Sequence, residues 1–220
     1  KYTYPKSIRS LVNDARHYSV GNEKLPSVTT ILAATQSDEK RESIARWQAK
    51  VGKKEAERVK NVAGKRGTAM HNYLEYMVAG KNLLDLTEEG VEAQRMAEVV
   101  RDKGFTDLEE IWGSEVVISY PGLYAGQTDL CGIYQGRESI IDFKQSNKPK
   151  KEEWIEDYYY QMVAYAMAHD AVHGTQIEQG VILMCTPDLF FQKFVLNGAR
   201  FRQYKWKWLW RLSEYYRKKM

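Results

Sequence analysis

Two neighbouring strand candidates contain charged residues at positions where a buried strand would be apolar. One is LYAGQTDLCGIY, which contains Asp129, and the other is ESIIDFKQ, which contains Asp142 and Lys144. Because side chains alternate along a strand, Asp142 and Lys144 share one face. Charged groups inside a sheet cost free energy unless they are paired or bind a ligand. The pattern therefore predicts a polar site built into the sheet.

A short hairpin between these strands would bring Asp129 beside Asp142. Two adjacent carboxylates repel each other unless a divalent cation lies between them. Lys144 would then be close enough to orient or deprotonate a water molecule, or to balance negative charge on a phosphate. The three residues therefore predict metal-assisted phosphodiester hydrolysis. The plainer alternatives are a surface acid at Asp129 and a solvent-exposed ion pair between Asp142 and Lys144.

Length and composition favour one globular domain. The chain has 220 residues, of which 43% are hydrophobic and 28% charged, and no segment approaches the ~18 consecutive apolar residues of a membrane span. Cys131 and Cys185 lack metal-site spacing, so we expect neither zinc nor disulfides, and a reducing compartment fits. No secretory signal or presequence is visible, which favours the cytoplasm of a bacterium or phage-infected cell over a mitochondrial matrix.

Charged residues are segregated along the chain. Residues 37–66 carry ten Lys or Arg against five acids, and residues 199–220 carry eight against one. Because the net charge is +4, the rest of the chain carries −8. Two basic segments around an acidic centre are expected if helices flank a polyanion while the centre holds cations. The alternative is that the basic segments are solvated helix faces.

Hydrophobic periodicity and capping residues predict an α/β chain with a helical first half. Helices are expected at residues 25–35, 37–51, 55–80, 87–104, 152–172 and 199–220, and strands at 114–120, 123–134, 138–145, 180–186 and 189–196. The first three strands should form an antiparallel meander. The helix at 55–80 is expected to bend near Gly64 and Gly67, and the helix at 87–104 to end at Gly104.

The last helix carries two sets of aromatic residues. One set follows helical spacing and is expected to pack in the core: Phe201, Tyr204, Trp208, Leu212 and Tyr215. Trp206 and Trp210 lie off that stripe among basic residues. They are candidates either for stacking on nucleic-acid bases or for packing on the domain.

Four motifs arrive in an order that resembles the RecB-type branch of the PD-(D/E)XK nucleases. They are His71 in GTAMHNYLE, Asp129 in YAGQTDL, Asp142-Phe143-Lys144 in IDFKQS, and Gln161 with Tyr165 in YYQMVAYAMA. Within this branch the PSVTTIL opening and the DFKQSNKPK block are similar to an exonuclease group with mitochondrial, phage and bacterial members. The resemblance runs from about Leu25 to the final helix. Thr128 stands where the family's name has proline, and Gln145 replaces a frequent threonine.

The resemblance implies a restriction-endonuclease-like PD-(D/E)XK core, with a central mixed sheet flanked by helices and a helical amino-terminal addition. It implies one nuclease domain over 1–220, with 1–110 mainly helical, 111–198 forming the catalytic sheet and helix, and 199–220 a basic helix. Mg²⁺, or Mn²⁺ in its place, would bind His71, Asp129, Asp142 and the backbone carbonyl of Phe143, with Glu115 as an outer or second-metal ligand. Lys144 would position the attacking water, while Gln161 and Tyr165 would orient Lys144 and the scissile phosphate.

The resemblance also implies how DNA is bound, because basic helices arch over the metal in the similar nucleases and admit a single strand. DNA contacts are expected from Arg46, Lys50, Lys53, Lys54, Lys65, Arg66, Ser146, Lys148 and Lys150. We therefore expect a monomeric exonuclease that degrades single-stranded DNA from free ends to short products, with replication or recombination proteins as further partners and no membrane association. The alternatives are an endonuclease acting on flaps or branched DNA, and a nucleic-acid-binding module without catalysis.

Overall fold

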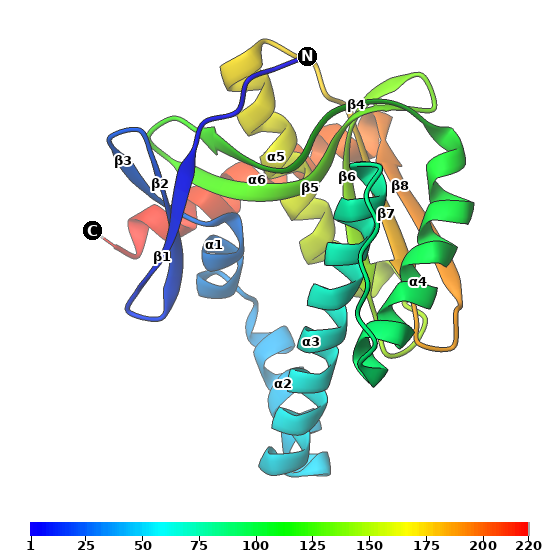
Figure 1. Cartoon of the computed structure of the whole chain (residues 1–220). Helices are drawn as coiled ribbons and strands as arrows, with labels where there is room; N and C mark the ends of the chain where they lie inside the picture. Colours follow the sequence, from blue (N-terminus) through cyan, green and yellow to red (C-terminus); the bar gives the residue numbers. More distant parts are fainter. Residues whose placement is uncertain (220) are drawn as a thin grey trace.

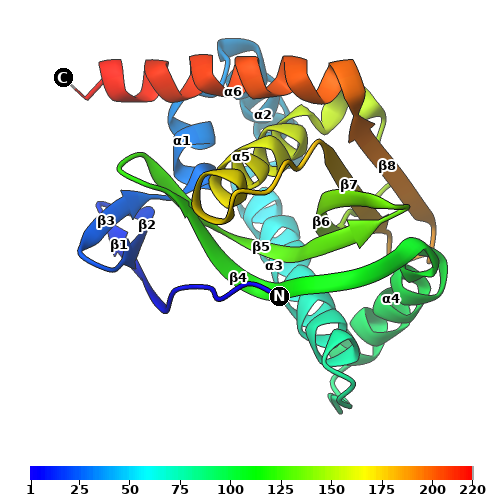
Figure 2. The ribbon, with the colours of Figure 1, turned by 90° about the horizontal axis from the view of Figure 1, so that it is seen from above.

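A five-stranded sheet forms the centre of the computed structural model, which describes residues 1–219 (Figures 1 and 2). Its strands are β4 (Leu108–Tyr120), β5 (Tyr124–Tyr134), β6 (Arg137–Gln145), β7 (Gln179–Cys185) and β8 (Phe191–Asn197), hydrogen-bonded in that order. Only the β6–β7 pair is parallel. The predicted mixed α/β sheet and the antiparallel meander at its start are therefore confirmed.

Helices cover both faces of this sheet (Figure 2). The helices are α1 (Val28–Ala34), α2 (Asp38–Val51), α3 (Lys53–Val78), α4 (Glu88–Gly104), α5 (Glu156–His173) and α6 (Gly198–Arg217), with 3-10 turns at Phe105–Asp107 and Glu152–Trp154. Alternate strand residues pack in two hydrophobic cores, one on each face of the sheet. Ile140 and Ile182 pack with α5 and α6, whereas Ile141 and Leu183 pack with α3 and α4. The α5 connection between β6 and β7 is the crossover that a parallel pair requires.

The helix bounds agree with the sequence analysis to within a few residues. Ser27 and Ser37 accept the expected capping hydrogen bonds from Thr30 and Lys40. Gly104 is the last residue of α4 and has a helical φ of −101°, so left-handed backbone is not the reason for glycine at this helix end. A Cβ at Gly104 would lie 2.7 Å from a Leu183 methyl group. Close helix-to-sheet approach therefore explains this glycine.

Helices α2 and α3 form a hairpin that projects from the body of the molecule (Figure 1). None of the residues of α2 is buried, although Ile44, Trp47 and Val51 recur at helical spacing and are 41%, 41% and 37% exposed. Gly52, at φ 86°, turns the chain directly into α3, which continues as one helix through Gly64. The apolar stripe of α2 therefore has no core beneath it.

A second, small sheet at the amino terminus was not predicted from the sequence. Strands β1 (Ser7–Val12), β2 (Ala15–Val20) and β3 (Glu23–Pro26) pair antiparallel in this order. Both residues of the β1–β2 turn, Asn13 and Asp14, have positive φ, as the two-residue turns of hairpins require. The first 26 residues of the segment expected to be mainly helical thus contain strands.

Helix α6 confirms the division of its aromatic residues. Phe201, Trp208, Leu212 and Tyr215 are buried, and Tyr204 packs against the same core. Trp206 and Trp210 are 69% and 78% exposed. Packing on the domain is therefore excluded for these two rings. Over residues 1–219, no helix is both long enough and apolar enough to cross a membrane.

Candidate metal and catalytic centre

Three possible metal ligands converge from three different elements. His71 comes from α3, Glu115 from β4 and Asp129 from β5, and one ligand atom of each lies within 4.8 Å of the others. His71 Nδ1 is 3.4 Å from Asp129 Oδ1 and 3.8 Å from Glu115 Oε1. The predicted ligands His71 and Asp129 are thus brought together, and Glu115 lies with them.

Asp129 is fixed by the neighbouring strand. Its carboxylate is buried, and Oδ2 accepts a hydrogen bond of 2.6 Å from the backbone N–H of Phe143. The β5–β6 register pairs Leu130 with Ile141, which places Asp129 and Asp142 next to each other at the end of that ladder. One oxygen of Asp129 is therefore held by the sheet while the other faces His71.

Asp142 and Lys144 form a buried ion pair on β6. Asp142 is 4% exposed, and the ammonium group of Lys144 also lies 4.9 Å from the centre of the Tyr158 ring. Burial lowers the pKa of Lys144, but the charges of Asp142 and Asp129 more than offset it and raise that pKa above its usual value. Lys144 is therefore a cation in the metal-free protein, and the solvent-exposed alternative for this pair is wrong.

The backbone of β4 turns out of regular strand geometry at Glu115. Glu115 has φ 52°, a left-handed conformation that is uncommon for a residue other than glycine. Gln127 donates a hydrogen bond of 2.6 Å to Glu115 Oε2, which leaves Oε1 facing His71. Strained backbone of this kind is concentrated at functional sites. Sequence reasoning did not single out Gln127, because a glutamine on a strand carries no distinctive signal.

The titratable groups are strongly coupled by burial and charge. Burial lowers the pKa of His71, but Asp129 and Glu115 more than compensate and raise it to about 10. For Asp142, burial raises the pKa to about 6, with Asp129 adding to this effect and Lys144 opposing it. The carboxylates therefore keep a proton on His71 at neutral pH when no metal is bound, as expected where negative charge is concentrated in a buried place.

Tyr165 of α5 reaches the same centre through a gap left by a glycine. Its ring is 5% exposed, and a Cβ added at Gly126 would lie 2.4 Å from its Cε1 atom. Burial is the main reason that the pKa of Tyr165 is well above its usual value, with Asp142 contributing. Gln161, one turn earlier, has a buried Oε1 atom without a hydrogen-bond partner among the described residues. Both residues have polar groups free to act on a ligand.

A cavity of about 520 Å³ opens beside the metal-ligand cluster. One wall is formed by α3, with Gly64, Gly67 and His71, and the floor includes Asp129 and Tyr165. The opposite wall contains residues of the amino-terminal sheet that sequence reasoning missed. Asp142, Lys144 and Gln161 do not line this cavity.

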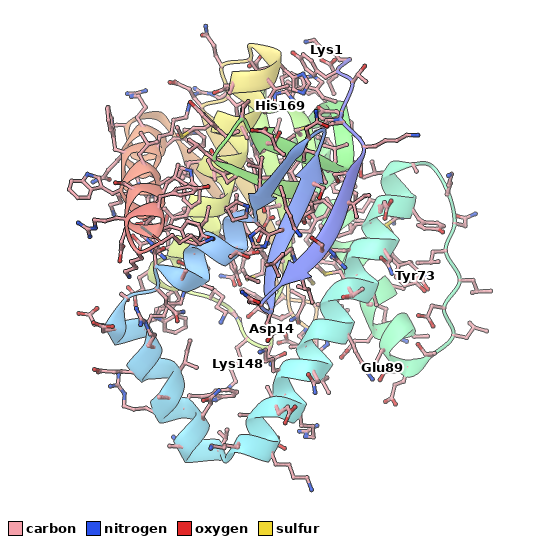
Figure 3. The ribbon with its side chains drawn as sticks, turned by 90° about the vertical axis from the view of Figure 1, so that its left-hand side faces the viewer. Lys1, Asp14, Tyr73, Glu89, Lys148 and His169 are labelled. Atoms are coloured by element: carbon pink, nitrogen blue, oxygen red, sulfur yellow. The ribbon has the colours of Figure 1, made fainter. Side chains whose placement is uncertain are left out.

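The predicted DNA contacts divide into two groups. Arg46, Lys50, Lys53, Lys54, Lys65 and Lys148 are exposed, and Lys150 is partly so. Arg66 is held by Glu92 at 2.6 Å and by Asn147 at 2.8 Å. Ser146 is buried and donates to the carbonyl of Lys148. In the view of Figure 3, Lys148 lies between α2 and α3. The structure therefore gives Arg66 and Ser146 local partners within the protein.

The donor set suits a hard or borderline divalent cation. One imidazole nitrogen and the carboxylate oxygens of Glu115 and Asp129 meet at a place where negative charge raises the pKa of His71. Carboxylate oxygens favour Mg²⁺ and Mn²⁺, and imidazole is better tolerated by Mn²⁺ than by Mg²⁺. A divalent metal therefore fits these residues, and neither Cys131 nor Cys185 belongs to the cluster.

The fold and the site together define an α/β protein with a cluster of histidine and carboxylate side chains that could hold a metal ion. Sequence comparison agrees: the chain is 29% identical over 209 residues to the human mitochondrial genome maintenance exonuclease 1 and 29% identical over 203 residues to the mouse protein. These matches cover 89% and 87% of this chain. The chain is homologous to this exonuclease, and the recognition based on its motifs is confirmed.

The chain spans 59% of the length of these two relatives. No protein-family model matches it. Among solved structures, a candidate exonuclease of Eubacterium rectale has 14% identity and a TM-score of 0.48, with 67% of this chain and 63% of that chain covered.

Proposed function

We propose that this chain is a divalent-metal-dependent deoxyribonuclease that degrades single-stranded DNA from a free end to short oligonucleotides. The observation that supports it most is the meeting of His71, Glu115 and Asp129 beside the buried Asp142–Lys144 pair. No structural role of a sheet requires this set, since buried charges without a ligand are unfavourable. Homology to an exonuclease supports the same reaction.

Each residue has a task in this proposal. His71, Asp129, Asp142 and the Phe143 carbonyl would hold Mg²⁺ or Mn²⁺, with Glu115 completing the set. A cation in that place supplies an acidic centre that lowers the pKa of water and neutralises phosphate charge. Lys144 orients the attacking water, because its ammonium is fixed between Asp142 and Tyr158. The hydroxyl of Tyr165 lines the cavity and donates to a phosphate oxygen.

The projecting α2–α3 hairpin supports a preference for free ends. Its exposed residues include Arg46, Lys50, Lys53 and Lys54, so a strand between the hairpin and the body would be contacted through its phosphates without sequence preference. At its root, α2 is tied to the body by an ion pair between Lys40 and Asp157. Because the hairpin is closed at its tip by Gly52 and tied to the body at its root, a DNA strand would pass beneath it only by threading a free DNA end.

Cleavage of end-labelled linear and circular single-stranded DNA tests this proposal. Wild-type protein with Mg²⁺ is expected to degrade the linear strand and spare the covalent circle. Lys144→Ala should lose at least 100-fold in rate, since water positioning and charge stabilisation each contribute on this scale. Lys24→Ala, an exposed lysine on β3 outside the cavity, is the matched control and should retain full activity.

The same assay separates the alternatives. Cutting of the circle would show an endonuclease, which acts on flaps or branched DNA. Binding without cleavage by the wild-type protein would show a nucleic-acid-binding module. If the exonuclease is confirmed, its location is either the cytoplasm of a bacterial or phage-infected cell or, as in the name of the relatives, the mitochondrion.

A further inference from the structure

Two arginines of the amino-terminal sheet face the candidate centre. Arg9 on β1 and Arg16 on β2 line the same 520 Å³ cavity as His71, Asp129 and Tyr165. Figures 1 and 3 show that the β1–β2 turn at Asp14 points in the same direction as the α2–α3 hairpin. The small sheet therefore forms the wall opposite α3.

The strand register places both arginines on one face of this sheet. Arg9 is directly opposite Tyr18, and Arg16 is two residues before Tyr18 on the same strand. Residues that are opposite each other, or two apart on one strand, share a face. Tyr18 is 3% exposed and packs with Leu25 and Ala125, so the sheet contacts the body of the protein at Tyr18, whereas Arg9 and Arg16 on the same face are exposed.

The backbone at Arg16 is anchored to the rest of the fold. Its carbonyl accepts hydrogen bonds of 2.9 Å from the N–H of Ser27 and the hydroxyl of Thr30. Ser27 in turn forms a bridge with Ala125 at the start of β5. The strand that bears Arg16 is thus fixed relative to β5, the strand that carries Asp129.

Among the described residues, neither Arg9 nor Arg16 forms an ion pair. Burial raises the pKa of Tyr18, and the positive charges of Arg16 and Arg9 oppose this rise. Arg16 also opposes the burial-induced rise at Tyr165. Two arginines without an ion-pair partner among the described residues therefore line the cavity next to the carboxylate cluster.

We propose that Arg9 and Arg16 bind backbone phosphates of the substrate strand next to the scissile phosphate, so that the amino-terminal sheet and α3 form the two sides of the substrate channel. This inference rests on the proposed nuclease function. Guanidinium groups bind phosphate oxygens in a planar, two-pronged geometry. The contact is to phosphate and carries no base specificity, so these residues position the strand and do not select its sequence.

Binding of a fluorescent single-stranded oligonucleotide tests the role of each arginine. The variants are Arg9→Ala, Arg16→Ala and the double variant, with Lys24→Ala as the control on the same sheet. Anisotropy is measured in EDTA, and again with Mg²⁺ in a Lys144→Ala background that blocks cleavage. Each Arg→Ala change should weaken binding about tenfold, as loss of one hydrogen-bonded charge contact does. The salt dependence, as log K against log salt, should become shallower by about 0.7 per lost phosphate contact.

Neutral methylphosphonate linkages locate the contacts. An oligonucleotide with one such linkage near the cleaved end should bind the wild-type protein more weakly, whereas the same linkage should have no further effect on the variant that has lost the matching arginine. This is the non-additivity expected of two groups in contact. Oligonucleotides with a terminal phosphate or a terminal hydroxyl distinguish the source of the phosphate. Sensitivity only to the terminal group would show that the arginines bind a terminal monoester and would overturn the proposed backbone contact.

The proposal is overturned if Arg9→Ala and Arg16→Ala, with unchanged melting temperatures, bind and respond to salt as Lys24→Ala does. Arg16→Lys provides a second check, because it keeps the charge and loses the two-pronged geometry; it should recover part of the affinity. If the wild-type protein neither binds nor cleaves DNA, the proposed nuclease function fails. If the wild type cleaves DNA and the arginine variants are unimpaired, the nuclease function stands and only the assignment of Arg9 and Arg16 to phosphate binding is wrong.

Discussion

Metal affinity should depend steeply on pH, because a cation must displace protons from its own ligands. The pKa of His71 is raised to about 10 and that of Asp142 to about 6 in the metal-free protein. A metal-bound imidazole must be neutral. Between pH 7 and 9, the logarithm of the association constant should therefore rise by about 1 for each pH unit. Below about pH 5, where Asp142 is also protonated, the slope should approach about 2.

The direction of each change in pKa determines whether the metal-free fold gains or loses stability as the pH rises. The folded pKa of His71 lies above the ordinary 6.5, so its proton stabilises the metal-free fold at low pH, and this contribution disappears as the pH rises through about 10. The pKa of Asp142 is raised as well, so the free energy of unfolding of the metal-free protein falls as the pH rises from about 4 to about 6. Added metal should consequently raise the melting temperature more at pH 8 than at pH 5.

Calorimetric titration with Mn²⁺ measures this effect directly. Repeating the titration in buffers of different ionisation enthalpy counts the protons released, and we expect about one per metal at pH 8. His71→Asn keeps a polar side chain without a titrating group, and its affinity should be nearly independent of pH from 7 to 9. Release of no proton by the wild type at pH 8 would refute the charge coupling of His71 with Asp129 and Glu115.

Three substitutions and one control substitution test the packing and the charges of the protein. Gly126→Ala forces a Cβ to within 2.4 Å of the Tyr165 ring, so urea unfolding should show a loss of about 1–3 kcal/mol and cleavage should slow. Lys144→Met leaves Asp142 buried without its cation; thermal unfolding in EDTA should show a loss of about 3–5 kcal/mol at neutral pH that shrinks below pH 5. Trp208→Ala removes a fully buried ring and should cost about 3–5 kcal/mol in denaturant titration, whereas Trp210→Ala should change stability by less than about 0.5 kcal/mol.

The residues on the central strands could be located from sequence because their environment is regular. Alternation along a strand is enough to place Asp142 and Lys144 on one face, and a short hairpin brings Asp129 beside them. Glu115 was expected as an outer or second-metal ligand at the start of a strand, yet β4 begins seven residues earlier, at Leu108. The approach of Glu115 to His71 depends on a left-handed backbone conformation, which no periodicity in the sequence reports.

The amino-terminal sheet was missed because its strands have little apolar alternation. Ile8 and Leu11 are 72% and 70% exposed, so the hydrophobic pattern that identifies a half-buried strand is absent. The Asn13-Asp14 pair is a turn signal between two short runs, and it was the one local indication available. Arg9 could not be assigned to the site from sequence, because only the folded register places it opposite Tyr18.

Chemistry and access are provided by parts of the chain with different stability. The carboxylates of Asp129 and Asp142 are buried on β5 and β6. Helix α2 has 14 residues and no buried side chain, and helices of this length are marginal without packing. Hydrogen exchange of α2 should therefore be fast relative to β6. If a bound strand contacts the basic residues of α2, substrate should slow exchange in the hairpin while leaving β6 unchanged.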